Sequence, residues 1–227
     1  MIRTEPTKRR PGRRSVAESQ DTRERLLAAA QRLFAQHGYA GTSIRDLGSA
    51  LGVASSSVLH HGGSKRKLYA LVLSRISGSL SGVASDIKSH EGADMMCEFA
   101  DRMMSWSDQN PEFLQIVQRE MMEVPRRLGE AHQWPLAGFV QEALELSERA
   151  TASLSADKVD AEMTLMVIIG AVTNFHVSLP TFMRLRGATD AVDMKRRFID
   201  TLDKLIRARL APPPAGFPHQ KEKRRPR

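Results

Sequence analysis

The stretch that decides the fold is TSIRDLGSALGVASSSVLHHGGSKRKLY, residues 42–69. Apolar residues recur at spacings of three and four over residues 44–51, which predicts a short helix that ends at Gly52. A second short helix is expected from residue 53 or 54 to about residue 61, where the Gly62–Gly63 pair ends it. Because glycine adopts turn conformations cheaply, two helices joined at Gly52 can cross steeply, as in a helix-turn-helix.

A longer helix is expected in front of this pair. Asp21 with Glu24 three residues later is typical of a helix N-terminus, and His37–Gly38 is typical of an end. Between them lies one apolar stripe, formed by Leu26, Ala30, Leu33 and Phe34. This helix would brace the two short ones.

The second short helix has few apolar residues for a core, chiefly Val58 and Leu59. Small polar side chains make up most of the rest, which indicates a surface that contacts a partner. Three cations, residues 65–67, follow at the start of the next helix. They would lie beside the phosphate backbone if the short helix entered a major groove of DNA.

Residues 22–69 strongly resemble the DNA-binding domain of the TetR family of transcriptional repressors. The resemblance is carried by an ordered set of residues: Leu26 to Phe34, Gly38, Tyr39, Thr42, Ser43, Leu47, Leu51, Gly52, Val53, His60, His61, Ser64, Lys65 and Leu68. It implies an all-α protein with an N-terminal three-helix DNA-binding domain and a C-terminal helical domain for ligand binding and dimerisation. It also implies a cytoplasmic, homodimeric, ligand-responsive regulator that binds a near-palindromic operator and releases it when a small apolar effector binds.

Carried over by position, the resemblance implies two kinds of DNA contact. Arg45, Ser55 and Ser56 would face base edges, and phosphates would be contacted by Thr42, Ser57, His61 and Lys65. Ser43 and His60 belong to the same expected DNA-binding set. Arg45 is the strongest candidate for sequence reading, because a guanidinium can donate two hydrogen bonds to guanine. The alternative for Arg45 is a solvated ion pair with a neighbouring acid.

Two positions depart from the family pattern, since Leu59 stands where a tyrosine is usual and Gly62 where an aromatic residue is usual. Leu59 cannot hydrogen-bond a phosphate, although it could contact a thymine methyl or pack inward. Gly62 beside Gly63 predicts a looser joint to the next helix. Both departures predict modest affinity for the operator.

The positive charge lies at the two ends of the chain. The protein has 227 residues and a net charge of +8, of which residues 1–14 carry +5 and residues 211–227 carry +4. Flexible cationic segments favour a polyanion such as nucleic acid, although they can also serve only solubility. We therefore expect a basic arm over residues 1–20 that could enter a minor groove, and a Pro-rich basic tail over residues 211–227.

The rest of the chain has helical periodicity throughout. The DNA-binding domain should occupy residues 21–70 and the ligand-binding and dimerisation domain residues 71–210. A fourth helix is predicted to end at about residue 89, and further helices are predicted at residues 94–108, 111–122, 134–153, 156–179 and 191–209. Pro125, Pro135 and Pro180 are expected to interrupt helices.

A ligand pocket is suggested by the methionine content of this second half. The chain has 11 methionines, and methionine adapts to varied apolar ligands, although it also fills irregular cores. The expected ligand-binding residues are Met103, Trp106, Phe113, Val117, Phe139 and Asn174, with Arg119 or Glu120 as further polar groups. For any one apolar member, a place in the core is the alternative.

A dimer seam is predicted along the last two helices. Ile199, Leu202 and Ile206 align on one helix, and residues 163–179 are apolar almost all round. Two domains held by such a seam would read sites about 34–36 Å apart.

Other classes of protein find less support. The lone Cys97 suits a reducing compartment, no signal peptide or convincing membrane span is visible, and no catalytic motif, metal signature or cofactor motif is present. We therefore expect neither an enzyme nor a metal or cofactor site. The remaining alternative is a helical interaction module whose basic tails bind nucleic acid without sequence preference.

Overall fold

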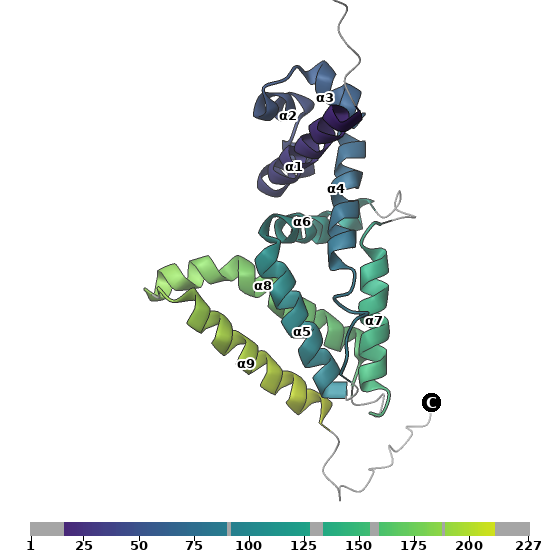
Figure 1. The fold of residues 1–227 in the computed structure, drawn as a ribbon. Helices are drawn as coiled ribbons and strands as arrows, with labels where there is room; N and C mark the ends of the chain where they lie inside the picture. Colours follow the sequence, from purple (N-terminus) through teal and green to yellow (C-terminus); the bar gives the residue numbers. More distant parts are fainter. Residues whose placement is uncertain (1–15, 90–91, 128–133, 155–158, 188, 212–227) are drawn as a thin grey trace, which may run out of the picture. The chain divides into compact units, whose positions relative to one another are not determined.

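All the regular secondary structure in the described part of the chain is α-helical, as predicted (Figure 1). The computed structural model describes residues 16–89, 92–127, 134–154, 159–187 and 189–211. Its helices are α1 (Val16–Gly41), α2 (Ile44–Leu51), α3 (Ser55–Gly62), α4 (Lys65–Leu80), α5 (Gly92–Gln109), α6 (Pro111–Arg127), α7 (Ala137–Thr151), α8 (Ala161–Arg186) and α9 (Ala191–Leu210). The predicted basic arm and basic tail fall almost wholly outside the described residues.

The chain divides into two compact units. The first comprises residues 1–76 and 115–130, and the second comprises residues 77–114 and 131–227. Helices α4 and α6 each contribute residues to both units. The first unit therefore contains, besides the helix-turn-helix, a part of α6 that is distant in sequence.

The core of the first unit forms on the predicted face of α1. Leu26, Ala30 and Phe34 are buried and Leu33 is half-buried. The Phe34 ring lies edge-on to that of Tyr69, with centroids 4.9 Å apart, so α1 packs against α4 through aromatic contact. Helix α1 extends three residues beyond Gly38, whose φ of 72° kinks it where the sequence predicts an end.

The core of the second unit is rich in methionine. Met95, Met96, Met103 and Met104 of α5 are all buried, together with the neighbouring Phe99 and Trp106. The other helices contribute Ala143 and Leu146 from α7, Leu165, Ile168 and Val172 from α8, and Leu202, Ile206 and Leu210 from α9. The α5 methionines therefore belong to the protein core, which is the alternative to a place in the ligand pocket.

Three helix ends differ from their predicted positions. Helix α4 ends at Leu80, about nine residues early, and the chain continues in turns to residue 86. Helix α6 runs two residues past Pro125, to Arg127. Helix α8 runs through Pro180 to Arg186, because one missing N–H does not stop a long helix that ends in a glycine cap at Gly187.

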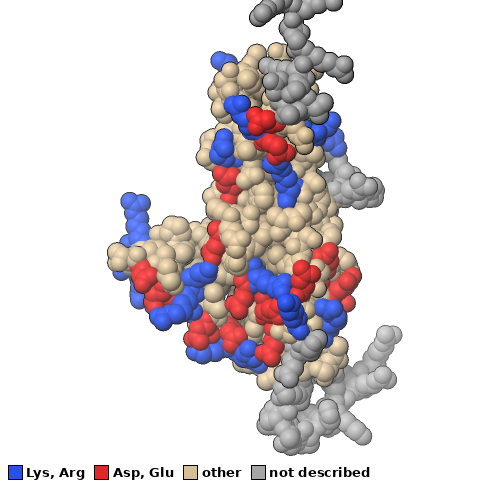
Figure 2. Space-filling model, viewed as in Figure 1, with Lys and Arg blue, Asp and Glu red and all other residues tan. Residues whose placement is uncertain are grey.

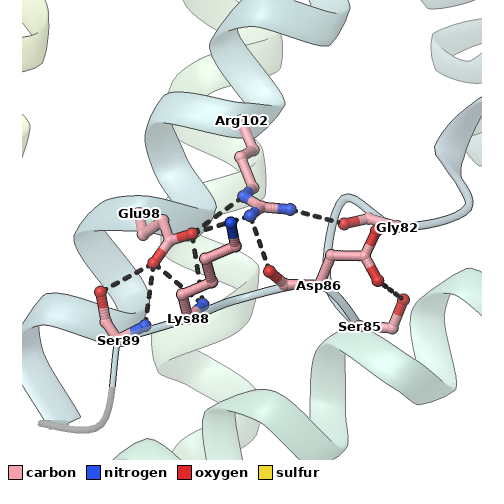
Figure 3. Close-up of polar contacts among 7 residues, drawn as sticks. All are labelled: Gly82, Ser85, Asp86, Lys88, Ser89, Glu98 and Arg102. Carbon is pink, nitrogen blue, oxygen red and sulfur yellow. Dashed lines mark hydrogen bonds and ion pairs between the residues drawn. The ribbon is translucent and has the colours of Figure 1, made fainter.

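The turns after α4 are fixed by an ion pair on α5 (Figure 3). Arg102 donates to Glu98 at 2.8 Å and to the carbonyl oxygens of Gly82 and Asp86 at 2.8 and 2.7 Å. Glu98 accepts from the backbone N–H and the hydroxyl of Ser89 at 3.1 and 2.7 Å. These turns are thus held by two side chains that lie one helical turn apart on α5.

Candidate DNA-binding surface

Helix α2 begins with a reciprocal cap. The Ser43 hydroxyl accepts from the backbone N–H of Asp46 at 3.1 Å, and Asp46 Oδ2 accepts from the backbone N–H of Ser43 at 2.8 Å. Hydrogen bonding from the Ser43 hydroxyl, at 2.7 Å, lowers the pKa of Asp46. The structure thus gives Ser43, one of the expected DNA contacts, the role of fixing where α2 starts.

The turn between α2 and α3 depends on two glycines. Gly52 is in the left-handed conformation with φ of 66°, and its N–H donates to the last turn of α2. Gly48 lies so close to the following backbone that a Cβ there would be 2.7 Å from the carbonyl oxygen of Val53. The sequence predicts the role of Gly52, but the close approach at Gly48 is visible only in the folded structure.

Helix α3 has one buried face and one exposed face. Val58 and Gly62 are buried, whereas Ser55, Ser56 and His60 are exposed. Ser57 and His61 are half-buried at the margins, and the His60 and His61 rings meet edge to face at 5.0 Å. The structure therefore gathers most of the expected DNA-contacting side chains of α3 on one side of this helix.

Thr42 differs from the other expected phosphate contacts because its side chain is buried, at 1% exposure. Its hydroxyl lies 2.9 Å from the carbonyl oxygen of Gly38 and 3.2 Å from that of Leu33, and donates to them. These bonds tie the start of α2 to the end of α1. The hydroxyl is thus engaged within the protein.

The cations at this surface differ in their partners. Lys65 lies over the Tyr39 ring with Nζ 4.4 Å from the centroid, a cation–π contact that holds it at the N-terminus of α4. Arg45, Arg66 and Lys67 are exposed, and in the described part of the chain no ion pair involves them. The Arg45 charge still acts on neighbouring Asp46, where it adds to the Ser43 hydrogen bonds that lower the pKa of that carboxyl.

The expected loose joint after α3 is a close contact instead. Gly62 is buried, and a Cβ there would lie 2.8 Å from Cδ2 of Leu68 on α4. The missing side chain therefore lets Leu68 approach the end of α3. The glycine at position 62, which suggested a loose joint between α3 and α4 in the sequence, therefore allows these two helices to pack more closely.

The six expected ligand-binding residues are not brought into one described cavity. Val117 belongs to the first unit and the other five to the second. Met103 and Trp106 are buried, and Phe113 and Phe139 are half-buried. Asn174 is exposed, in a groove of about 910 Å³ between α8 and α9 that contains none of the other five.

Arg119 and Glu120, considered as polar groups of the pocket, have structural partners in the first unit. Arg119 donates to the carbonyl oxygens of Ala35 and Gln36 at 3.3 and 3.1 Å. Glu120 is buried and accepts a hydrogen bond from Tyr69 at 2.6 Å. Spacing on α6 could not reveal this, because both partners are distant in sequence.

Two polar atoms in the second unit were not anticipated. Ser107 Oγ and Trp134 Nε1 are buried, and neither has a hydrogen-bond partner among the described residues. Such atoms in a native fold favour a bound polar group. No sequence signal distinguishes Ser107 from the other serines. Also within the described residues, no cluster of three or more His, Cys, Asp or Glu side chains could hold a metal ion.

A large apolar surface lies on α8 and α9. Its exposed side chains are Met163, Met166, Val167, Val177, Phe182, Leu185, Val192 and Leu205. Of the residues aligned on α9, Leu202 and Ile206 are buried beside Cys97 and Met104 of α5, so they belong to the face that packs inward. Helix α8 is also long and apolar enough to cross a membrane, and 17% of its most apolar window is buried.

The charges of α9 are largely paired. Lys204 contacts Asp200 at 2.6 Å, and Arg207 contacts Asp203 at 2.9 Å and Asp94 at 2.6 Å. Figure 2 shows acidic and basic side chains mixed over the part of the surface where α5 and α9 lie. This face therefore has little net attraction for a polyanion.

Comparisons with known proteins agree with the geometry of the first unit. Residues 26–72 match the family described as bacterial regulatory proteins, tetR family. The chain is 42% identical to the HTH-type transcriptional repressor AcnR of Corynebacterium efficiens over 55 residues. These 55 residues make up 24% of this chain and 29% of that protein. The match thus spans less than a third of that relative.

Solved structures match over a larger part of the chain. The ketosteroid transcriptional regulator KstR2 of Mycobacterium tuberculosis has a TM-score of 0.61 at 16% identity, over 82% of this chain and 94% of that one. The protein SCO4942 of Streptomyces coelicolor has a TM-score of 0.60 at 21% identity, over 82% and 97%. At these identities the likeness concerns the fold.

The fold and the first unit together define a helix-turn-helix protein with a second, helical unit. Its helix-turn-helix residues 26–72 match the N-terminal domain of the tetR family of bacterial regulatory proteins.

Proposed function

We propose that the protein is a ligand-responsive transcriptional repressor that binds a near-palindromic operator as a homodimer and leaves it when a small apolar or amphipathic effector binds. The observation that carries this proposal is the two-sided helix α3. Val58 and Gly62 fix its inner face to the unit, and its serines and His60 face outward. A short helix braced in this way is the element that helix-turn-helix proteins place in the major groove.

Arg45 is the proposed base-reading cation. It is exposed on α2, and no described acid pairs with it. Its guanidinium can donate two hydrogen bonds to one guanine, which is worth about 1–3 kcal/mol of discrimination. Ser55 and Ser56 are proposed to face base edges, with Ser57, His61 and Lys65 nearer to phosphates. For Thr42 we propose a structural role.

The exposed apolar surface of α8 and α9 supports a homodimer. Exposed side chains such as Met166, Val167 and Leu185 are 64%, 65% and 78% accessible in the single chain. Large apolar side chains exposed together on one pair of helices favour an interaction site. A symmetric pair would present two α3 helices to two half-sites, which is the physical reason for a near-palindromic operator.

The effector site is proposed to lie in the second unit. Buried Ser107 Oγ and Trp134 Nε1 support a ligand with polar atoms, because both are without partners among the described residues. Buried side chains of α5, including Met103 and Trp106, are proposed to supply apolar contact. Effector binding that favours a state with lower operator affinity would release DNA by linkage.

Selection of bound duplexes from a random pool tests the proposal. We expect enrichment of a near-palindromic sequence that stays bound at a salt concentration where random duplex is released. Replacement of Arg45 by alanine should relax the preference at one position of each half-site, whereas Arg149→Ala on α7 is the matched control. Equal retention of selected and random duplex would favour the non-specific module instead.

A compound screen against the selected duplex tests the effector. We expect some apolar or amphipathic compounds to lower operator affinity, and Trp134→Phe, which removes the indole N–H, to weaken that response without changing affinity in the absence of compound. Binding of these compounds with no change in operator affinity would contradict the proposed coupling.

A further inference from the structure

One apolar side chain stands among the polar residues on the exposed face of α3. Leu59 is 46% exposed, although the neighbouring Val58 is buried at 1%. It follows Ser55 by four residues and Ser56 by three, so all three lie on the same side of the helix. The alternative that Leu59 packs inward is therefore wrong.

This exposure gains nothing for the folded monomer. A leucine side chain is stabilised by removal from water, and the inner face of α3 is already occupied by Val58 and Gly62. The Leu59 side chain has no donor or acceptor, so it cannot hydrogen-bond a phosphate. Its position on the serine face places it where α3 would approach base edges, as the proposed function requires.

The major groove offers one apolar group to such a side chain. The C5 methyl of thymine is the only methyl on a base edge there, and apolar side chains distinguish thymine by contact with it. The serines at positions 55 and 56 are short, and their hydroxyls both donate and accept, so they discriminate poorly between bases. We propose that Leu59 is a specificity-determining residue that reads a thymine methyl in each half-site of the operator.

Replacement of thymine by uracil tests this inference, because it removes the methyl group and leaves base pairing intact. In the duplex selected by the wild-type protein, each thymine is replaced in turn by deoxyuridine, and affinity is measured at fixed salt. We expect one position per half-site at which the loss of the methyl weakens binding about fourfold, and about 15-fold when both half-sites are changed.

Leu59→Ala should bind the thymine and uracil duplexes equally. Val140→Ala, which truncates an exposed apolar side chain on α7, should retain the difference between them. Circular dichroism and thermal unfolding should be unchanged in both variants, because neither side chain is in a core.

The inference rests on the proposed function, but different experimental results would overturn the two proposals. Absence of any enriched duplex would overturn both. A selected operator that the wild type binds equally with thymine or uracil would overturn the role of Leu59 alone. A uracil effect that persists in Leu59→Ala would assign the methyl contact to another residue and would also overturn this inference.

Discussion

Tyr69 of α4 donates a hydrogen bond to Glu120 of α6 at 2.6 Å, and both residues are buried in the first unit although 51 positions separate them. The bond attaches a late segment of the chain to the helix-turn-helix. A buried carboxylate requires such donors, since burial without hydrogen bonds is costly.

Tyr69→Phe should therefore destabilise the protein by about 1–3 kcal/mol, because Glu120 loses a hydrogen bond that water cannot replace. Chemical denaturation of the wild type, Tyr69→Phe, Glu120→Gln and the double variant measures the effect. The cost of Tyr69→Phe should be smaller in the Glu120→Gln background. Equal costs in the two backgrounds would show that the two side chains are not coupled.

Thr42→Val should lower stability by about 1 kcal/mol, because the donor to the carbonyl oxygens of Leu33 and Gly38 is lost while the shape is kept. Thr42→Ser keeps the hydroxyl and is the matched comparison in the same denaturation experiment. If Thr42→Val retained full stability and lost only affinity for DNA, the hydroxyl would be a phosphate contact after all.

Gly48→Ala should destabilise the first unit by about 1–3 kcal/mol and reduce operator binding, because the new Cβ would collide with the backbone oxygen of Val53. Gly78→Ala on α4 is the control. There a Cβ meets nothing within 4 Å, so alanine should be neutral or stabilise by up to about 1 kcal/mol. Thermal unfolding compares the two variants. Equal unfolding midpoints for both would show that a Cβ at position 48 does not collide with the backbone.

Glu98 should make stability depend on pH in acid. The hydroxyl and backbone N–H of Ser89, with Arg102, lower its pKa from 4.5 to about 2. Because the folded state binds this proton less readily than the unfolded state, the contribution of Glu98 is complete above about pH 4.5 and is lost as pH falls towards 2.

Glu98→Gln should therefore lower stability at neutral pH and weaken the dependence of stability on pH over that acid range. Denaturation midpoints measured at a series of pH values check this. Glu145→Gln, on exposed α7 surface, is the control and should leave the profile unchanged. An unaltered acid profile in Glu98→Gln would show that the carboxylate is not held as the structure indicates.

Periodicity alone determined the helical class and the three helices of the N-terminal domain. The stripe of Leu26, Ala30 and Phe34 and the cap at Ser43 are local features, because the residues that define them are less than three turns apart. The helix-turn-helix could therefore be predicted from one short stretch, and the resemblance to the TetR family rests on residues 22–69.

Tertiary structure alone decided which polar and apolar side chains face outward. Thr42 and Glu120 are buried while Leu59 is exposed, against what their residue types favour. The Thr42 hydroxyl donates to carbonyl oxygens of α1, and Glu120 accepts from Tyr69, 51 positions away. Leu59 is exposed because the inner face of α3 is occupied by Val58 and Gly62. Only the packing also shows that Leu202 and Ile206 face α5 within the chain. Helical periodicity defines an apolar face, but only packing determines what covers it.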